Sequence, residues 1–223
     1  MKNIESHMAT IIIENNGLSK ILIKPGADEY LDINLIDKNI KLIEMSYIII
    51  LQLETPLDTV EYTINKCHEK QKIVILKPSP GIKLSENIIQ KVNYLIPNES
   101  ELEIISGKPT YDKEQIELAC KTIMNKGAQN LIVTLGNKGC ILWNKDGKKE
   151  YCSYPVDKFV DSTGADDCFI GVFAAYLSKK ATLDDAIKYA NLAASISVSS
   201  VGTMNSLPKL EAINKKREKI TNW

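Results

Sequence analysis

The chain has 223 residues and a mass of 24.9 kDa, which is enough for a hydrophobic core in one large domain or two small ones. Its 28 Lys and Arg residues balance 28 Asp and Glu residues, so the formal net charge is zero. Because nucleic acids and anionic membranes both select basic proteins, this balance argues against either as the main partner.

The cysteines and the N-terminal stretch both indicate a cytoplasmic protein. The five cysteines are widely spaced, with no CxxC pair and no Cys/His cluster, so we expect neither a zinc site nor a disulfide framework. We interpret them as buried or idle thiols of a reducing compartment. The N-terminal stretch lacks the apolar core of a secretory signal, and no apolar run is long enough to span a bilayer.

The first predicted unit in the chain is a β-hairpin over residues 9–24. Residues 9–14 and 19–24 are rich in β-branched residues, and Asn16-Gly17 between them is a strong turn signal. Pro25-Gly26 ends the second strand. Since a two-stranded hairpin is marginally stable by itself, we expect a further strand or a helix to cover it.

From Ile40 onward, short apolar runs alternate with amphipathic stretches. The predicted strands are residues 47–53, 73–76, 94–96, 131–135 and 140–143. The predicted helices between them are residues 56–70, 85–92, 99–106 and 113–126. The first four strands are nearly continuous in apolar residues, which is typical of strands buried on both faces. Strand and helix in alternation, with short connections, predict a mostly parallel sheet flanked by helices.

The last third of the chain is predicted to be mainly helical. A second hairpin over residues 143–154, with Asp146-Gly147 at its turn, precedes helices at 165–179 and 183–199 and a charged helix from Pro208. There is no repeat, linker or low-complexity tract. We therefore expect one α/β domain over residues 1–223, with its core in residues 40–223.

Residues 160–169 are the most informative stretch for chemistry. Small residues lead directly into an apolar helix, and such a turn leaves the first N–H groups of the helix free to hold an anion. An ordinary helix start explains the same residues, with Ser162 or Thr163 as the cap and the acidic residues favouring the helix dipole. This stretch alone leaves both interpretations open.

Several short motifs accompany this turn. Residues 161–167 match the pattern Asp-Thr-Thr-Gly-Ala-Gly-Asp with two changes. The other motifs are Gln52–Val60, Pro78–Pro80, Pro97–Glu101, Thr134–Gly139, Ala190–Ala194, Gly202 and Ser206–Pro208. In this order and spacing, the chain resembles the ribokinase family of ATP-dependent carbohydrate and nucleoside kinases. The resemblance implies a three-layer ribokinase-like α/β fold with a small β lid hairpin at the N-terminus. A dinucleotide-binding dehydrogenase is not supported, because no predicted strand leads into GxGxxG.

The resemblance also implies an activity and its central residues. Asp167 would be the base that takes the proton of a sugar hydroxyl as the hydroxyl attacks the γ-phosphate of ATP. The backbone N–H groups of Gly164, Ala165 and Asp166, together with that of Asp167, would form the anion hole. Glu54 would face the sugar, which is expected to be of the ribose type. The implied partners are thus ATP and a small sugar.

Two cofactors follow from the resemblance, Mg²⁺ and, as in potassium-activated members, K⁺. Asn98 and Glu101 would hold Mg²⁺ and phosphate through water, because hard oxygen ligands suit a hard cation. The residues implied at the nucleotide are Asn98, Thr134, Gly136, Gly139 and Asn191. The residues implied around the monovalent cation are Asp161, Thr163, Ser197, Ser200, Gly202 and Ser206.

Taken singly, these residues also have ordinary explanations. Asn98 suits the cap of the helix that follows it, and Glu54 suits the cap of the helix that begins at Pro56. Thr134 fits a plain strand end, and Asn191 fits an exposed helix position. The serines of residues 195–200 fit simple helix packing with small side chains. Only their occurrence together, in the order of the family, favours the functional interpretation.

Asp166 departs from the family pattern, which has glycine at this position. Two like charges about 4 Å apart repel by roughly 1 kcal/mol in water and about 4 kcal/mol at an intermediate dielectric. Since about 1.4 kcal/mol is tenfold in rate, a carboxylate here would slow transfer by roughly tenfold to a thousandfold. The loss is smaller if the side chain turns outward or binds Mg²⁺. We expect Asp166→Gly to raise turnover or, if turnover is undetectable, phosphate-dependent ATP binding.

A second departure concerns the start of the chain. Family members begin with a longer segment, which by resemblance supplies the first core strand, half of the lid sheet and residues that grip the sugar. The exposed strand edges that follow from its absence predict self-association into a homo-oligomer such as a dimer. Two hypotheses therefore remain open: a sugar kinase, or a truncated and catalytically weak nucleotide-binding or assembly module of the same fold.

Overall fold

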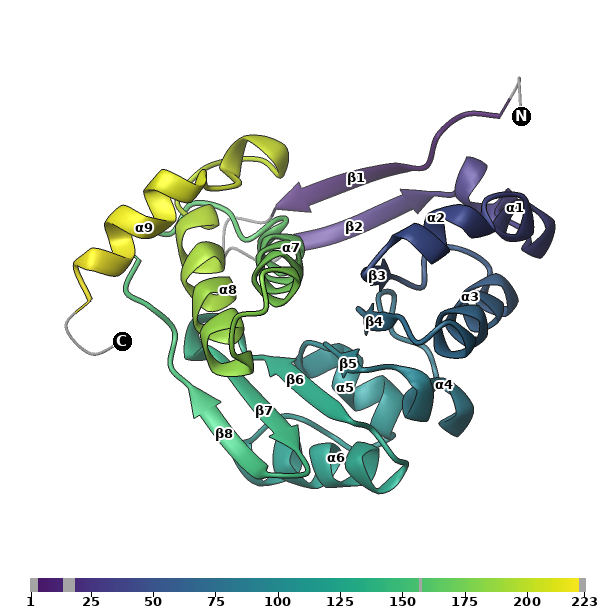
Figure 1. Ribbon diagram of the computed structural model, residues 1–223. Helices are drawn as coiled ribbons and strands as arrows, with labels where there is room; N and C mark the ends of the chain where they lie inside the picture. The colour runs from purple at the N-terminus through teal and green to yellow at the C-terminus, as the bar shows by residue number, and fades with distance from the viewer. Residues whose placement is uncertain (1–3, 14–18, 157, 221–223) are drawn as a thin grey trace.

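A computed structural model describes residues 4–13, 19–156 and 158–220 (Figure 1). Its centre is a six-stranded sheet whose strands follow one another in sequence order. The strands are β3 (Ile48–Leu51), β4 (Ile73–Leu76), β5 (Tyr94–Leu95), β6 (Asn130–Thr134), β7 (Cys140–Asn144) and β8 (Gly147–Tyr151). The pairs from β3 to β6 are parallel, while β7 and β8 are antiparallel to their neighbours. The predicted mostly parallel sheet is thus confirmed.

Helices cover both faces of this sheet (Figure 1). One face carries α3 (Leu57–Glu69), α4 (Glu86–Lys91), α5 (Glu99–Ser106) and α6 (Lys113–Asn125). The other face carries α7 (Ala165–Ser178) and α8 (Leu183–Ser197), and α9 (Leu210–Glu218) packs on the outside of α8. The alternation of side chains along a strand produces this division, because Val74 and Leu76 of β4 point to α3–α6 whereas Ile75 points to α7 and α8.

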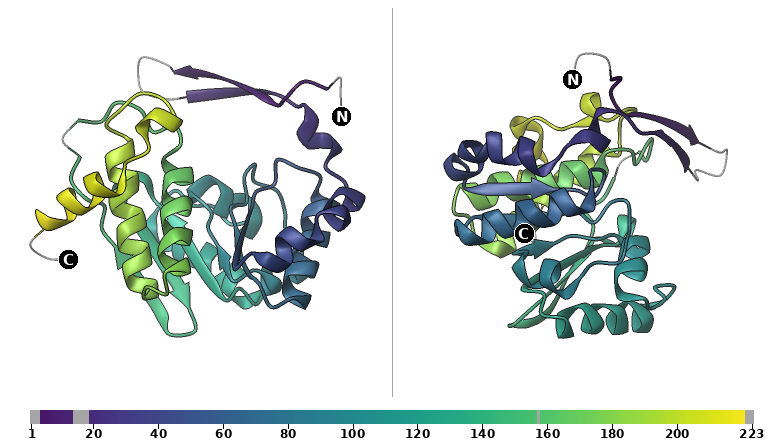
Figure 2. Two further views of the ribbon diagram at one scale, coloured as in Figure 1. Left: turned by 45° about the horizontal axis from the view of Figure 1, so that its top comes forward. Right: turned by 90° about the vertical axis from the view of Figure 1, so that its right-hand side faces the viewer.

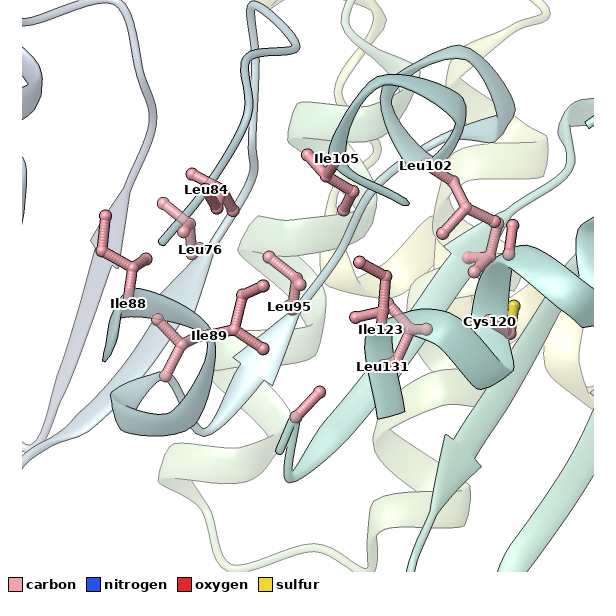
Figure 3. Close-up of a cluster of buried hydrophobic side chains, with 14 of the residues drawn as sticks. Leu76, Leu84, Ile88, Ile89, Leu95, Leu102, Ile105, Cys120, Ile123 and Leu131 are labelled. Atoms are coloured by element: carbon pink, nitrogen blue, oxygen red, sulfur yellow. The ribbon is translucent and has the colours of Figure 1, made fainter. Parts of the chain in front are cut away.

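The larger core cluster lies between the sheet and α3–α6, and Figure 3 shows its centre. Leu76, Leu95 and Leu131 of three adjacent parallel strands meet side chains of α4, α5 and α6. All three leucines are fully buried, as the apolar character of these strands predicts. This packing fixes the carboxyl ends of β3–β6 relative to one another, and those ends carry the residues described below.

A separate β-hairpin stands apart from the main sheet in both views of Figure 2. Its strands β1 (Met8–Ile13) and β2 (Ser19–Lys24) pair antiparallel, with Met8 opposite Lys24 and Ile13 opposite Ser19. The predicted turn at Asn16-Gly17 lies outside the described residues. Within the described chain, no third strand pairs with the hairpin, so the expected covering strand is not found there.

Short helices that the sequence analysis did not assign connect the hairpin to the core. They are the 3-10 helix Ala27–Tyr30, α1 (Ile33–Lys38) and α2 (Ile40–Met45). Asp32 caps α1 by accepting a hydrogen bond from the Leu35 N–H group at 2.8 Å. Helices of six residues show less than two turns of periodicity, which explains why the apolar pattern did not reveal them.

Most of the cysteines are buried, in line with their interpretation as buried or idle thiols. Cys67, Cys120, Cys140 and Cys168 are buried, and Cys152 is exposed; none forms a disulfide. Burial raises the pKa of Cys120 to about 12, so this thiol is inert at neutral pH. Over the described ranges, the helices are too short or too polar for any of them to cross a membrane.

Candidate active site

The start of α7 is a turn shaped by Asp161. Asp161 Oδ1 accepts hydrogen bonds from the Thr163 N–H group at 2.9 Å and from Thr163 Oγ1 at 2.7 Å. Gly164 follows in the left-handed conformation, with φ of 78°, and is the N-cap of the helix. No side chain caps α7, so the alternative that Ser162 or Thr163 serves as its cap is wrong. The turn is held from outside the helix and leaves the helix N-terminus open.

Backbone donors are free at this turn. Ala165 N–H bonds to the Ser162 carbonyl at 3.1 Å, whereas the N–H groups of Gly164, Asp166 and Asp167 have no acceptor among the described residues. Unpaired N–H groups and the positive end of a helix dipole favour a bound anion. Within the described chain, the unpaired N–H groups expected at this turn are thus found at Gly164, Asp166 and Asp167, whereas the predicted donor Ala165 is occupied by the Ser162 carbonyl.

Asp167 lies at this turn with its side chain exposed. Its Oδ1 accepts a hydrogen bond from Gln52 Nε2 at 3.2 Å, and Gln52 comes directly after β3. Glu54 is exposed and makes no hydrogen bond or ion pair with a described residue. Pro56 is the N-cap of α3 and that helix has no side-chain cap, so the interpretation of Glu54 as a cap is wrong. Gln52 belongs to a motif noted above, but its link to Asp167 was missed.

Lys77 is a site residue that the sequence analysis missed entirely. It follows β4 and is 4% exposed. Its Nζ lies 2.6 Å from Asp166 Oδ2 and 2.7 Å from Glu101 Oε2. Asp166 Oδ1 also accepts a hydrogen bond from Thr134 Oγ1 at 3.2 Å. The Asp166 carboxylate thus has a counter-charge, which the repulsion argument from the sequence did not include. The available signal was a lysine at the carboxyl end of a parallel strand, the edge at which such sheets bind ligands.

Asn98 and Glu101 form a capping box at the start of α5. Asn98 Oδ1 accepts from the Glu101 N–H group and from Ser100 Oγ, both at 2.9 Å, and Glu101 Oε2 accepts from the Asn98 N–H group at 2.8 Å. The cap interpretation of Asn98 is therefore correct. Its amide oxygen uses both lone pairs in these bonds.

These donors fit Mg²⁺ only as an ion held through water. Asn98 Oδ1 is occupied, and the described residues contain no group of three or more His, Cys, Asp or Glu that could hold a metal ion. Glu101 Oε1 accepts no hydrogen bond from a described residue. Because Mg²⁺ in nucleotide sites keeps several waters and binds substrate phosphates, one such carboxylate oxygen suffices.

A pocket of about 320 Å³ adjoins the start of α7. Thr134, Gly136, Gly139 and Asn191, all predicted at the nucleotide, line it together with Ala165 and Asp166. The pocket is also lined by Tyr154, Val156 and Phe159, which the sequence analysis missed. Apolar residues beside Pro155 were a signal for them, because ligand pockets are lined mainly by apolar and aromatic side chains.

Two predicted residues have clear local reasons for their place in this pocket. Gly139 has φ of 93°, and a Cβ there would lie 2.0 Å from the Tyr151 carbonyl oxygen, so only glycine fits. Asn191 is 7% exposed and its Nδ2 donates to the Cys152 carbonyl at 2.7 Å. The interpretation of Asn191 as an exposed helix residue is therefore wrong.

The loop before α7 meets the loop after α8. Asp161 Oδ2 accepts a hydrogen bond from the Gly202 N–H group at 3.1 Å, and the Val198 carbonyl accepts from Asp161 N–H at 3.2 Å. The Thr163 hydroxyl, followed by backbone N–H groups, lowers the pKa of Asp161. The structure thus brings Asp161, Thr163 and Gly202 into direct contact.

The predicted serines of this region are less closely joined to Asp161. Ser197 Oγ donates to the Ala194 carbonyl at 2.9 Å, and Ser206 Oγ donates to the Thr203 carbonyl at 2.8 Å. Ser200 N–H bonds to the Ser197 carbonyl at 3.3 Å. The hydroxyl of Ser197 therefore bonds within its own helix, as the ordinary interpretation held.

Comparisons with known proteins show the family and the fold of the chain. Residues 2–210 match the model of the pfkB family carbohydrate kinases. The chain is 35% identical over 210 residues to "Deoxyribokinase" of Salmonella typhi, covering 94% of this chain and 68% of that protein. A ribokinase structure from Thermotoga maritima is 34% identical with a TM-score of 0.86 and covers 97% of this chain and 71% of its own. The structure of Arabidopsis thaliana ribokinase complexed with ribose and ATP is 26% identical with a TM-score of 0.84, over 96% and 69%.

The predicted ribokinase-like fold is confirmed by these structures, and the predicted family by the match over most of the sequence. The exposed Asp167 lies beside free N–H groups at the start of α7, next to a pocket lined by Thr134, Gly136, Gly139 and Asn191. Asn98, the other residue predicted at the nucleotide, does not line this pocket. The chain belongs to the pfkB family of carbohydrate kinases.

Proposed function

We propose that this chain transfers the γ-phosphate of ATP to a hydroxyl group of a ribose-type sugar. The observation that carries the proposal is the open start of α7, where the N–H groups of Gly164, Asp166 and Asp167 lack acceptors among the described residues and the Asp167 carboxylate is exposed. The relatives support it, since one is named a deoxyribokinase and another was solved with ribose and ATP.

The nucleotide base occupies the pocket beside α7 and α8 in this proposal. The wall residues Tyr154, Val156 and Phe159 contact the base, and Asn191 lies next to it on α8. Gly136 and Gly139 let the backbone approach the nucleotide, and Thr134 lies where the phosphates leave the pocket. The phosphates then extend to the N-terminus of α7, whose free N–H groups stabilise their negative charge.

In the transfer step, the sugar hydroxyl oxygen attacks the γ-phosphorus while the bond from that phosphorus to the bridging oxygen breaks. Asp167 takes the hydroxyl proton, and ADP leaves with the bridging electron pair. The Gln52 amide, at 3.2 Å, orients the Asp167 carboxylate. A carboxylate of ordinary basicity is adequate here, because the loose transition state needs orientation and charge stabilisation more than a strong base. Glu54 faces the sugar.

Two metal ions complete the proposal. Glu101, with Asn98 beside it, holds Mg²⁺ through water, and the ion when bound neutralises charge on the β- and γ-phosphates. Asp161 and Thr163, with backbone oxygens near Ser197, Ser200, Gly202 and Ser206, enclose K⁺, which fixes the loop before α7. Asp161 joins the two loops through its own hydrogen bonds, so K⁺ would strengthen an existing contact.

Asp167→Asn tests the function directly, because it keeps the shape and removes the base. We expect sugar-dependent ADP formation from ATP to fall by about 10²- to 10⁴-fold, the usual contribution of a general base. ATP affinity, measured by isothermal titration calorimetry, should change little. Gln52→Ala removes the amide that orients Asp167 but keeps the base, so it should cause a smaller loss of turnover.

The same two assays distinguish the alternatives. ATP binding without transfer to ribose, deoxyribose or related sugars would contradict the kinase proposal and favour a nucleotide-binding module of the same fold. Absence of ATP binding would contradict both. Equal turnover by the wild type and Asp167→Asn would show that Asp167 is not the base.

A further inference from the structure

Lys77 is a buried cation whose charge no residue of the proposed mechanism uses. In the described part of the chain, the buried charged side chains are Lys77 and Glu101. Lys77 continues the alternation of β4, so it shares the face of Ile75 and points toward α7. Burying an ion pair costs desolvation energy that its attraction often only offsets, so such a pair is weak evidence for a purely stabilising role.

The position of the ammonium group is unusual for a lysine. Its two carboxylate partners lie in the first turns of two helices, Glu101 in α5 and Asp166 in α7. Helix N-termini carry partial positive charge and disfavour a cation. The arrangement therefore adds a full positive charge to a place where two helices already favour an anion.

The ammonium group also retains a hydrogen-bond donor. An ammonium group has three N–H bonds, and its partners Glu101 Oε2 and Asp166 Oδ2 account for two of them within the described chain. Asp166 links this group to the free N–H donors, because its own backbone N–H is one of them. The Lys77 ammonium group and an anion bound at the start of α7 are thus separated by about the length of the Asp166 side chain.

We propose that Lys77 binds the phosphates of the nucleotide. Its third N–H donates to a phosphate oxygen held at the N-terminus of α7, while Asp166 and Glu101 hold the ammonium group in place. This inference rests on the proposed function, since it takes the anion to be ATP. Asp166 then has a defined role, because it positions and partly neutralises a phosphate-binding lysine.

The charges define an order of affinities. Removing the ammonium group leaves the Asp166 and Glu101 carboxylates facing the phosphates, so phosphate binding should weaken. Removing the Asp166 charge leaves Lys77 with Glu101 as its single counter-charge, so phosphate binding should strengthen. Adenosine has no phosphate, so neither substitution should alter its affinity. The ratio of ATP to adenosine affinity therefore isolates the contribution of the phosphates.

The test is calorimetric titration of ATP and adenosine in buffer with EDTA, so that Mg²⁺ does not mask the lysine. We expect Lys77→Met to reduce the ATP-to-adenosine affinity ratio by about ten- to a hundredfold, the range for loss of a hydrogen bond from a charged donor. Asp166→Asn should raise the ratio. Lys77→Arg keeps the charge and should therefore keep much of the ratio that Lys77→Met loses. Lys148→Met is the matched control: Lys148 lies between Glu117 and Glu150, away from the nucleotide pocket, and should leave the ratio unchanged.

Each outcome decides the proposal. If wild type binds ATP more tightly than adenosine and Lys77→Met keeps the same ratio, Lys77 is a structural ion pair and this inference is wrong while the proposed function stands. If wild type binds ATP only when Mg²⁺ is added, this inference is wrong while the proposed function stands. If wild type binds neither compound with or without Mg²⁺, both fail together. If Lys77→Met does not fold, Lys77→Met/Asp166→Asn removes the two paired charges together; its ratio must fall below that of Asp166→Asn alone, or the inference is overturned.

Discussion

Asp166 shows how one contact changes the meaning of a residue. Viewed in the sequence, a carboxylate beside an anion hole only repels phosphate, and the size of the effect follows from distance and dielectric. In the structure the same carboxylate lies 2.6 Å from the Lys77 ammonium group and also accepts a hydrogen bond from Thr134. Its charge is partly compensated, because the same ammonium group also pairs with Glu101, so the inhibition expected from an isolated carboxylate is an upper bound.

For Asp166→Gly, we still expect higher turnover or, if turnover is undetectable, tighter phosphate-dependent ATP binding. The gain should be about tenfold or less, because the substitution removes a carboxylate that Lys77 already offsets. Steady-state kinetics with ribose and calorimetry with ATP measure it. No gain in either measurement would refute the inhibitory role of Asp166.

At the scale of elements, the contact between β8 and α8 positions one wall of the pocket. Asp184, in the first turn of α8, bonds to Lys149 and, at 2.9 Å, to Tyr151 Oη, both of β8. It also pairs with Lys188 one turn later at 2.8 Å. Further along the same helix, Asn191 lines the pocket. Asp184 therefore links the edge of the sheet to the helix that carries a nucleotide residue.

Partial burial by itself raises the pKa of Asp184, but hydrogen bonds from Lys149, Lys188 and Tyr151 outweigh it and lower the pKa from 3.8 to about 2. A depressed pKa in the folded state means that the stabilisation is complete well above pH 3.8 and is lost as the pH falls toward 2. We expect Asp184→Asn to reduce the free energy of unfolding by about 1 kcal/mol at pH 7, the upper range for partly exposed ion pairs. The difference from wild type should shrink as the pH falls through 2 and vanish below it.

Urea denaturation at several pH values measures this dependence. Asp146→Asn is the control, because Asp146 is an exposed acid at the turn between β7 and β8 whose side chain makes no hydrogen bond or ion pair with a described residue. A difference between Asp184→Asn and wild type that stays constant with pH would contradict the assignment to the Asp184 charge.

At the scale of the whole molecule, the hairpin exposes apolar side chains on both of its faces. Met8, Ile12 and Leu22 share one face in the observed register, and Ile11 and Ile23 share the other; all five are exposed. Strands β1 and β2 form a two-stranded sheet that no other described strand extends, and β3 is an edge strand of the main sheet. Exposed apolar strands with free edges favour pairing with another chain.

We therefore predict that the chain forms a dimer or a larger homo-oligomer through the hairpin. Leu22→Lys/Ile23→Lys places a charge on each face and should shift the chain toward monomer, as measured by size-exclusion chromatography with light scattering. Tyr111→Lys, an equally drastic change at an exposed position between α5 and α6, should not. A wild-type chain that stays monomeric at high concentration would contradict the prediction.

Most elements of the core were predictable because their signals are local. The predicted strand 73–76 and helix 99–106 have the observed bounds, and the other predicted core elements form with small shifts at their ends. The apolar pattern of a buried strand or an amphipathic helix is carried by residues close in sequence. The two short helices before β3 lacked enough turns to show such a pattern.

The site was predictable to the extent that its residues stand in motifs. The glycines at 136, 139 and 164 all have positive φ, as their places in tight turns required. The roles of single polar residues were not settled in this way. Asn98 is a cap, Asn191 is buried against Cys152, and Glu54 has no described partner. Each of these outcomes depends on what lies opposite the residue in space.

Local signals specified the order of strands and helices along the chain and the division of the core between two faces of one sheet, because periodicity acts over a few residues. They left two explanations for the turn before α7, and the structure selected the one without a side-chain cap. The contacts of Lys77 with Glu101, 24 residues away, and with Asp166, 89 residues away, are set by tertiary packing. Such a meeting depends on strand and helix ends that packing brings to one edge of the sheet. No local pattern records it, since charge pairing acts through space and not along the chain.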